Sequence, residues 1–425
     1  MAARPEAAPL RVLLTESVSA SARQAVTVLT RRGHSVGVLE PRRGGLLSAT
    51  CRVRRRHPVP AFGADPVGYL EALLDVLRTH RYDVVLPIHE QVAVLSRYPG
   101  EVAGLGVGIA VPPFTSLARV ANKAEAVRLL TDLGLPQPAT ALVGSADELC
   151  SAAELPCYVK LPVASGSRGV WFASRPEDLR RLASRTEVID AFARGWPVLV
   201  QRPVAGRFVM MQAVFDHGEP VAAHAVLRVH EGVLGSAAVK ESVHLPELQR
   251  QLGTLGAELR WHGALSVDAI IDRHGAARLV DVNPRLVEPV NAELAGADLI
   301  GRLLAVSRGE SPSPAAAGRA GVRTHMALMA LLRHGELGHR RRDVAAELWN
   351  VLTGRDRYAG SVEELLPARW DPPAALAFIA VGTALMASTR LWRPIAGSSP
   401  ASMTLSADAW RALKPDPRWP VGDPA

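Results

Sequence analysis

Lysine is nearly absent from this sequence of 425 residues, although basic residues are common. Only four of its 49 basic residues are lysines, and the remainder are arginines; the lysines are Lys123, Lys160, Lys240 and Lys414. Lysine carries a compact point charge, whereas arginine presents a planar fork of donors. In a chain that uses arginine almost everywhere, we expect lysine to remain where a compact charge is needed. The four positions are therefore candidate sites.

Cysteine and aromatic residues are also scarce. The three cysteines (Cys51, Cys150 and Cys157) have no zinc or redox spacing, and their odd number argues against a disulfide framework. Aromatic residues make up 5% of the chain, and the net charge of +8 is spread along it, so we expect no nucleic-acid-binding stripe. The dense basic runs RVRRRH (52–57) and HRRRD (339–343) are interpreted as solvated surface. The N-terminus lacks the pattern of a signal peptide, which favours a cytoplasmic location.

The chain has no long hydrophobic run of the kind that spans a membrane easily. Its one extended uncharged segment, 372–389, has 18 residues, which is the lower limit for a membrane span. Its Ala, Gly, Thr and Ser content makes insertion weak compared with a Leu-rich segment. We interpret it as a buried or partner-facing helix, and the alternative is weak contact with the inner face of a membrane.

Strands and helices alternate in the first part of the chain. LRVLLTES and DVVLPI have the composition of buried strands and are separated by helical patterns, which predicts a doubly wound parallel α/β sheet over residues 10–115. The first turn has no glycine fingerprint, which argues against a Rossmann dinucleotide site. Residues 116–310 mix hairpins and helices, as in an α+β domain. SPSPAAAG (311–318) is interpreted as a linker to a helix-leaning tail that ends at residue 425.

Three polar side chains alternate at the end of an apolar run in LVDVNPRLVE (279–288): Asp281, Asn283 and Arg285. If the loop 273–276 closes a hairpin without a bulge, Asp272 faces Ala277 and Asp268 faces Asp281. Facing carboxylates repel each other, and a divalent cation turns that repulsion into a binding site. Ligands that are all oxygen favour Mg²⁺. The alternative is a solvated hairpin edge with incidental acids.

Two further segments have weaker signals. In KLPVASGSRGV (160–170), Lys160 ends a strand, and the small residues after it allow backbone N–H groups to approach an anion. This loop is not a Walker A motif, and an ordinary β-turn is the alternative. VLVQRPVAG (198–206) is a buried strand whose end could offer backbone groups to an adenine. Lys240 lies in GVLGSAAVKESV, a predicted flexible stretch that could close over the site.

The order of these features along the chain resembles the ATP-grasp superfamily of ATP-dependent carboxylate–amine ligases. The resemblance extends from about residue 10 to about residue 310. Within the superfamily, the chain is most similar to predicted bacterial ATP-dependent carboligases through DVVLPIHE, NKAEAVRLLTDLGLPQPAT and KESVHLPEL. It implies a preATP-grasp domain (1–115), an ATP-grasp domain (116–310) with a lid at about 140–203, and a helical C-terminal region (311–425).

The resemblance also implies a role for each matching residue. Lys123 and Lys160 would contact the ATP phosphates, and Arg285 would orient the acyl phosphate or the substrate carboxylate. The mobile lid loop would contain Ser165, Gly166, Ser167, Gly169 and Val170. The hinge strand would place Gln201, Arg202 and Val204 beside the adenine. The ligands of Mg²⁺ or Mn²⁺ would be Asp268, Asp281 and Asn283.

The sequence departs from the family pattern at several of these positions. Gln201 stands where Glu is usual, and Asp281 stands where Glu is commoner. The small residues usual after NPR are replaced by LVEPVN, which would place Glu288 close to Arg285, where it could neutralise the arginine or receive an amine. The ribose-contacting acid expected near Phe208 is not evident.

The function implied by the resemblance is that of a ligase with ATP and Mg²⁺ as cofactors. It would activate a small-molecule carboxylate as an acylphosphate and join it to an amine or another nucleophile. One alternative is a bicarbonate-using carboxylase or purine-type ligase, although a biotinyl MKM stretch is not obvious after Gly318. Another is a non-catalytic nucleotide-binding regulatory protein, suggested by Gln201, Glu288 and the apolar segment 372–389. The pattern leaves the acid, the nucleophile and the oligomeric state open.

Overall fold

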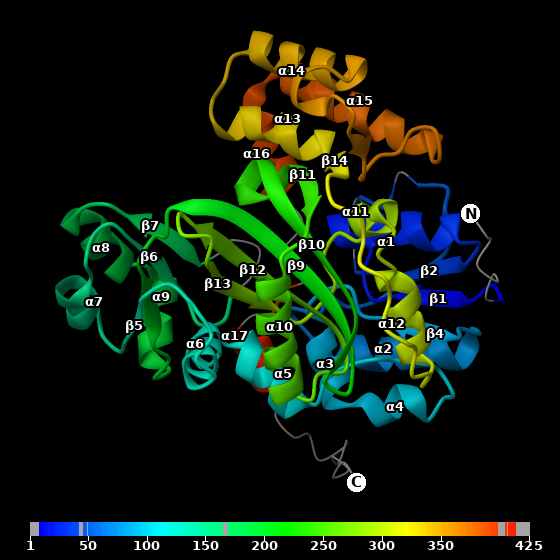
Figure 1. The fold of residues 1–425 in the computed structure, drawn as a ribbon, viewed down its shortest axis with the longest axis horizontal. Helices are drawn as coiled ribbons and strands as arrows, with labels where there is room; N and C mark the ends of the chain where they lie inside the picture. The colour runs from blue at the N-terminus through cyan, green and yellow to red at the C-terminus, as the bar shows by residue number, and fades with distance from the viewer. Residues whose placement is uncertain are drawn as a thin grey trace.

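The computed structural model describes residues 8–41, 46–48, 50–164, 169–397, 404–405 and 407–413. Figure 1 shows an N-terminal α/β domain in blue, a small domain in teal over the residues predicted to form the lid (140–203), a large central sheet in green, and a layer of helices above that sheet in yellow and orange; the small domain is called the lid below. Of the three sheets in the described residues, one is parallel throughout, one is antiparallel throughout, and the largest is antiparallel except for one parallel pair of strands at its edge. The predicted combination of α/β and α+β domains is therefore confirmed.

The N-terminal domain is built on a parallel four-stranded sheet in the order β3-β2-β1-β4. Three apolar residues of β1, Val12, Leu13 and Leu14, are completely buried in it. The next helix begins where the Ser19 hydroxyl accepts a hydrogen bond from the Ala22 N–H at 3.0 Å. The elements are β1 (Arg11–Leu14), α1 (Ala20–Arg31), β2 (Ser35–Glu40), β3 (Val53–Pro58), α2 (Pro66–Thr79), β4 (Val84–Leu86), α3 (Val92–Arg97), α4 (Pro99–Ala103), α5 (Phe114–Ala121) and α6 (Lys123–Asp132).

The basic run RVRRRH lies on the edge strand β3, apart from its first residue, Arg52. Arg54 and Arg55 are exposed, as expected, but His57 is buried and its Nε2 lies 2.7 Å from the Tyr82 hydroxyl. Burial first, and then the positive charges of His80 and Arg55, lower the pKa of His57 to about 4.

Acidification is expected to destabilise the fold through His57. In the unfolded chain a histidine titrates near pKa ~6.5, so the unfolded state binds the proton first. The free energy of unfolding should therefore decrease as the pH falls from about 6.5 towards 4, by about 1–2 kcal/mol for this one group between about pH 7 and about pH 5. Urea unfolding at both pH values should show a smaller loss in His57→Gln than in the wild type. Equal losses would contradict the assignment.

The lid is an antiparallel four-stranded sheet in the order β5-β8-β6-β7, with three short helices packed against it. Two of these helices, α8 and α9, are separated by Ser184 and Arg185. Ser165, Gly166 and Ser167 lie outside the described residues. The elements are β5 (Thr140–Val143), α7 (Ala146–Ala152), β6 (Cys157–Lys160), β7 (Val170–Ala173), α8 (Pro176–Ala183), α9 (Thr186–Ala193) and β8 (Val198–Gln201).

The central sheet has seven strands in the order β13-β12-β9-β10-β11-β14-β15. A hairpin at His217-Gly218 joins its two longest strands, and α10 packs its leucines into the same core as β9. The elements are β9 (Gly206–Asp216), β10 (Glu219–Glu231), the short 3-10 helix η1 (Val233–Gly235), β11 (Ala237–Val243), α10 (Pro246–Glu258), β12 (Gly263–Asp272), β13 (Ala277–Asn283), α11 (Val290–Ala295) and α12 (Leu299–Ser307).

The hairpin β12–β13 places Asp268 directly opposite Asp281, as predicted, but by a different register from the one assumed. Ala277 pairs with Ile271 and not with Asp272, so the turn is one residue tighter than expected. A shift in register between Asp268 and Ala269 leaves Val280 as an extra residue on β13, which restores the pairing of the two acids. The expectation of a hairpin without a bulge is therefore wrong, although the predicted pair is right.

The C-terminal region is not simply a helical tail. Two of its strands extend the central sheet, and most of its helices share a core that includes Leu328, Leu331, Val344 and Leu385. The linker segment before it has no helix or strand. The elements are β14 (Arg323–His325), α13 (Ala327–Glu336), α14 (Arg341–Thr353), β15 (Val362–Glu363), α15 (Pro372–Ala387), α16 (Trp392–Gly397) and α17 (Ala407–Ala412).

Buried polar contacts join this region to the first helix of the chain. Arg23 of α1 forms an ion pair with Asp371 at 2.7 Å, and both side chains are completely buried. Beside it, the Gln24 amide donates to Glu364 at 2.8 Å. These contacts fix the helical layer to the N-terminal domain.

The apolar segment 372–389 forms helix α15, which lies in the helical layer of Figure 1. Ala374 and Leu385 are completely buried, whereas Leu376 and Ile379 are 68% and 60% exposed. The expected buried helix is thus buried on one side only. Among the residues that the structure describes, no helix is long and apolar enough to cross a membrane.

Candidate active site

Two facing carboxylates form the centre of the site. Asp268 and Asp281 are paired across β12 and β13, and the Asn283 amide lies 3.5 Å from an Asp268 oxygen. Burial, and then the negative charge of Asp281, raise the pKa of Asp268 to about 7. The described side chains therefore leave negative charge at this point incompletely neutralised, as expected for a cation site. The donor set of two carboxylates and one amide oxygen fits Mg²⁺ or Mn²⁺.

The two lysines predicted to bind phosphate lie beside these acids. Asn122 caps α6 and so places Lys123 at its first position, where the Nζ contacts Asp281 at 3.1 Å. Lys160 ends β6, and its Nζ donates to the carbonyl oxygen of Val280 at 3.2 Å. Val280 is the extra residue of the bulge. Burial, partly offset by Asp281, lowers the pKa of Lys160.

The lysines determine the charge state of Asp281. Burial alone would raise the pKa of this carboxyl, but the charges of Lys123 and Lys160 and the hydrogen bond from Lys123 outweigh burial and lower it. Asp281 is therefore the ionised member of the acid pair, and it contacts the Lys123 nitrogen, which a phosphate could contact instead.

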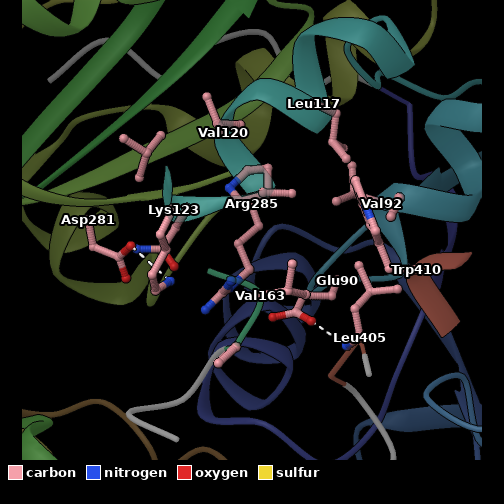
Figure 2. A pocket seen from close by; sticks show the side chains of 16 residues that line it. Glu90, Val92, Leu117, Val120, Lys123, Val163, Asp281, Arg285, Leu405 and Trp410 are labelled. Atoms are coloured by element: carbon pink, nitrogen blue, oxygen red, sulfur yellow. Dashed lines mark hydrogen bonds and ion pairs between the residues drawn. The ribbon is translucent and has the colours of Figure 1, made fainter. Parts of the chain in front are cut away.

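Arg285 lies at the junction between this cluster and the N-terminal domain. Figure 2 shows its side chain reaching between the Lys123–Asp281 pair and the carboxylate of Glu90. Its Nε is buried and has no hydrogen-bond partner among the described residues. The guanidinium also acts electrostatically on Glu16, a buried acid in the loop after β1. The Nε–H of Arg285 could therefore donate a hydrogen bond to an anion.

No family model matches the chain. It is 26% identical over 232 residues to the carbamoyl phosphate synthase large chain of Thermomicrobium roseum, a match that covers 51% of this chain and 21% of that protein. It is 36% identical over 118 residues to the formate-dependent phosphoribosylglycinamide formyltransferase of Prochlorococcus marinus, a match that covers 26% of this chain and 29% of that protein. The chain thus spans less than a third of the length of these curated relatives.

Solved structures match much more of the chain. Biotin carboxylase from Campylobacter jejuni, with β-γ-ATP, has a TM-score of 0.58 at 16% identity and covers 74% of each chain. The biotin carboxylase domain of Hydrogenobacter thermophilus 2-oxoglutarate carboxylase, in complex with MgADP and bicarbonate, has a TM-score of 0.56 at 16% identity. The match covers 72% of this chain and 71% of that one. The L-amino acid ligase of Bacillus licheniformis has a TM-score of 0.53 at 14% identity, and the match covers 71% of this chain and 75% of that one. The chain has the ATP-grasp fold.

The space between the lid and the central sheet is nearly closed. The cavity bounded by Lys160, Gln201 and Leu279 is about 20 Å³, which holds about one water. Gln201 is buried and donates to Thr140 at 3.0 Å. A nucleotide does not fit a cavity of this size.

The adenine contacts at Arg202 and Val204 stay a prediction, and one backbone donor among them already has a partner. The Arg202 N–H donates to the Ala139 carbonyl oxygen at 2.9 Å and is not free for a base. Val204 is half-buried just beyond the strand. At the lid loop, Gly169 has a φ of +67°, and a side chain there would meet Leu161 at 2.9 Å. Val170 pairs with Lys160, so the described end of this loop is continuous with the lysine strand.

Glu288 does not neutralise Arg285, contrary to one expectation. It forms an ion pair with Lys240 at 2.5 Å, and Lys240 also pairs with Glu364 at 2.5 Å. Lys240 is only 1% exposed on strand β11, so the expectation of a flexible segment closing over the site is wrong. Glu288 has a φ of +48°, an unusual conformation for Glu, and this buried pair holds it there.

A larger cavity of about 570 Å³ opens from the acid pair towards the C-terminal region. Asp268, Asp281, Asn283, Arg285 and Glu288 all line it. The remaining wall comes from the loop after β1, strand β9, η1 and the helical layer. Its size is that of a small-molecule site.

Sequence reasoning missed three parts of this site: Glu16, Glu90 and the C-terminal wall. Glu16 follows β1 at the carboxyl end of a parallel strand, where α/β domains commonly bind ligands, and this rule could have marked it. Glu90 lies in the DVVLPIHE segment and accepts a hydrogen bond from the Leu405 N–H. The wall comes from residues distant in sequence, and no local pattern marks it.

Proposed function

We propose that this protein is an ATP-dependent ligase that activates a carboxylate as an acylphosphate and joins it to an amine or another nucleophile. The observation that supports it is that Asp268, Asp281, Asn283 and Arg285 line one cavity, while Lys123 contacts Asp281 and Lys160 contacts the neighbouring Val280 carbonyl oxygen. Phosphoryl transfer needs positioning and neutralisation of charge more than covalent help from the protein, and this cluster offers both.

In the proposed reaction, a carboxylate oxygen attacks the γ-phosphorus of ATP and the bond to the β-phosphate oxygen breaks, which releases ADP. The nitrogen of an amine then attacks the acyl carbon, phosphate leaves, and the nitrogen loses a proton. Asp268, Asp281 and Asn283 would hold Mg²⁺ or Mn²⁺, which offsets the charge on the phosphates. Lys123 and Lys160 would bind the phosphates, and Arg285 would hold the carboxylate or its phosphate.

A bicarbonate-using enzyme is the main alternative within the fold. Bicarbonate is small and wholly polar, whereas the cavity beside the acids measures about 570 Å³ and has extensive apolar lining. This observation favours a larger organic acid.

An ADP-release assay across acids and amines, with mass spectrometry of the products, tests the proposal. ADP formation that requires an organic acid, with a condensed product, is expected. ADP formation that depends on bicarbonate would favour the alternative. ATP binding without ADP formation across the panel would favour a regulatory protein.

Lys160→Met is expected to weaken ATP binding by about 10–100-fold, because a charge-assisted hydrogen bond to a phosphate contributes about 1.5–3 kcal/mol. The protein should still fold, since the lysine is buried and methionine fills similar space. Titration calorimetry with ATP and Mg²⁺ measures the effect. Arg180→Met, which removes an exposed cation from the same lid, is the matched control. If both variants bind ATP as the wild type does, Lys160 is not a phosphate ligand.

A further inference from the structure

The cavity of about 570 Å³ has two chemically different ends. One end carries Asp268, Asp281, Asn283, Arg285 and Glu288. Of the described residues that the C-terminal region contributes to the lining, none has a polar or charged side chain; they include Leu328, Met329, Leu332, Ala377, Val381 and Ile395. Phe208 and Met210 of strand β9 add further apolar surface.

Helix α15 contributes to this wall in a regular way. Ala377 and Val381 are one helical turn apart and therefore lie on the same side, and both line the cavity. Ala374 and Leu385 pack into the core of the helical layer, while Leu376, Ile379 and Ala380 are exposed. The uncharged character of 372–389 thus serves the cavity wall as well as the core.

We infer that the substrate acid carries an apolar alkyl or aromatic body, which lies along the wall formed by α13, α15 and α16. Its carboxylate lies at Arg285, whose buried Nε has no partner among the described side chains. This inference rests on the proposed ligase function, and it names the class of acid that such a ligase would activate. Apolar binding sites of this size favour ligands by the apolar area that they bury.

A homologous series of acids measures the contribution of the wall. We choose acetate, butyrate, octanoate and dodecanoate, with full-length protein, ATP, Mg²⁺ and hydroxylamine as a small nucleophile that traps an acylphosphate as a hydroxamate. The specificity constant kcat/KM should rise about fourfold for each added methylene until the chain fills the cavity. Titration calorimetry of octanoate with the protein provides a second readout that needs no turnover.

Ala377→Trp and Ala380→Trp form a matched pair on the same helix. The first substitution places an indole in the cavity, and the second places it on the exposed side of α15. Ala377→Trp should reduce octanoate affinity at least tenfold and leave binding of ATP with Mg²⁺ unchanged, whereas Ala380→Trp should change neither. Val381→Phe provides a second cavity variant if Ala377→Trp does not fold.

The outcomes separate this inference from the proposed function. If acetate and octanoate give ADP and hydroxamate equally well and the cavity variants match the wild type, the apolar acid is excluded while the ligase stands. A dependence on the length of the amine, and not of the acid, would also overturn it. If octanoate binds in the wild type and not in the cavity variants, but no ADP forms, the ligase function fails while the apolar site stands.

Discussion

Asp281→Ala is expected to abolish metal-dependent ADP formation, by at least about a thousandfold, a loss of about 4 kcal/mol in transition-state stabilisation. Asp281 is the ionised member of the facing acid pair and the partner of Lys123 at 3.1 Å. Without it, a divalent cation keeps only Asp268 and Asn283 among the proposed ligands. The measurement is ADP release with Mg²⁺ and the best acid of the screen.

The same variant should behave differently towards ATP alone. In the free protein, Asp281 occupies Lys123 and lowers the positive charge felt by a phosphate, so its removal should leave metal-free ATP binding unchanged or make it tighter. Asp190→Ala, which removes an exposed acid from the lid, should keep full activity. Wild-type turnover in Asp281→Ala would refute the metal site, and weaker metal-free ATP binding would argue against the phosphate roles of the lysines.

Asp371→Ala is expected to lower the free energy of unfolding by about 3–5 kcal/mol, the usual cost of leaving a buried charge without its partner. Arg23 and Asp371 are both completely buried and 2.7 Å apart. Asp371 also accepts hydrogen bonds from the Thr50 hydroxyl and, at 3.3 Å, from the Cys51 N–H. Urea unfolding monitored by circular dichroism measures the loss.

Two companion variants show whether the cost arises from burial. Asp75→Ala breaks a surface pair in which the Asp75 side chain is 74% exposed and the Arg78 side chain is 52% exposed. It should change the free energy of unfolding by less than about 1 kcal/mol. The double variant Arg23→Met, Asp371→Leu removes both buried charges and should recover much of the loss. A small effect of Asp371→Ala together with no recovery in the double variant would show that the pair does not stabilise the fold.

The sequence predicted the parts of this protein that depend on local pattern. The strands of the N-terminal domain follow from runs such as RVLL, and the Asp268–Asp281 pair follows from the alternation of polar residues in β13. The register shows the limit of such reasoning, because two errors cancelled: the turn is tighter than assumed, and the bulge at Val280 compensates. Hydrophobic alternation predicts which face a side chain lies on, but it does not reveal an extra residue.

The parts that could not be predicted arise from contacts between distant residues. The residues before Lys240 include Gly232, Gly235 and Ser236, a composition typical of a mobile loop. Lys240 is nevertheless buried, and it pairs with Glu288 and Glu364, which lie 48 and 124 positions further along the chain. The segment 372–389 was interpreted from composition alone. Its use as a cavity wall depends on helix α13 of the helical layer packing against η1 and strand β11, which no pattern within the segment indicates.

The Arg23–Asp371 pair also affects the order in which the protein folds during its synthesis on the ribosome. Its members are separated by 348 positions, and at about 5–20 residues per second the carboxylate is synthesised roughly 17–70 s after the arginine. Throughout that interval the first helix carries a cation for which the nascent chain has not yet made the partner. The N-terminal domain cannot complete its packing until the C-terminal region has emerged, so the first segment to be synthesised is among the last to reach its final state.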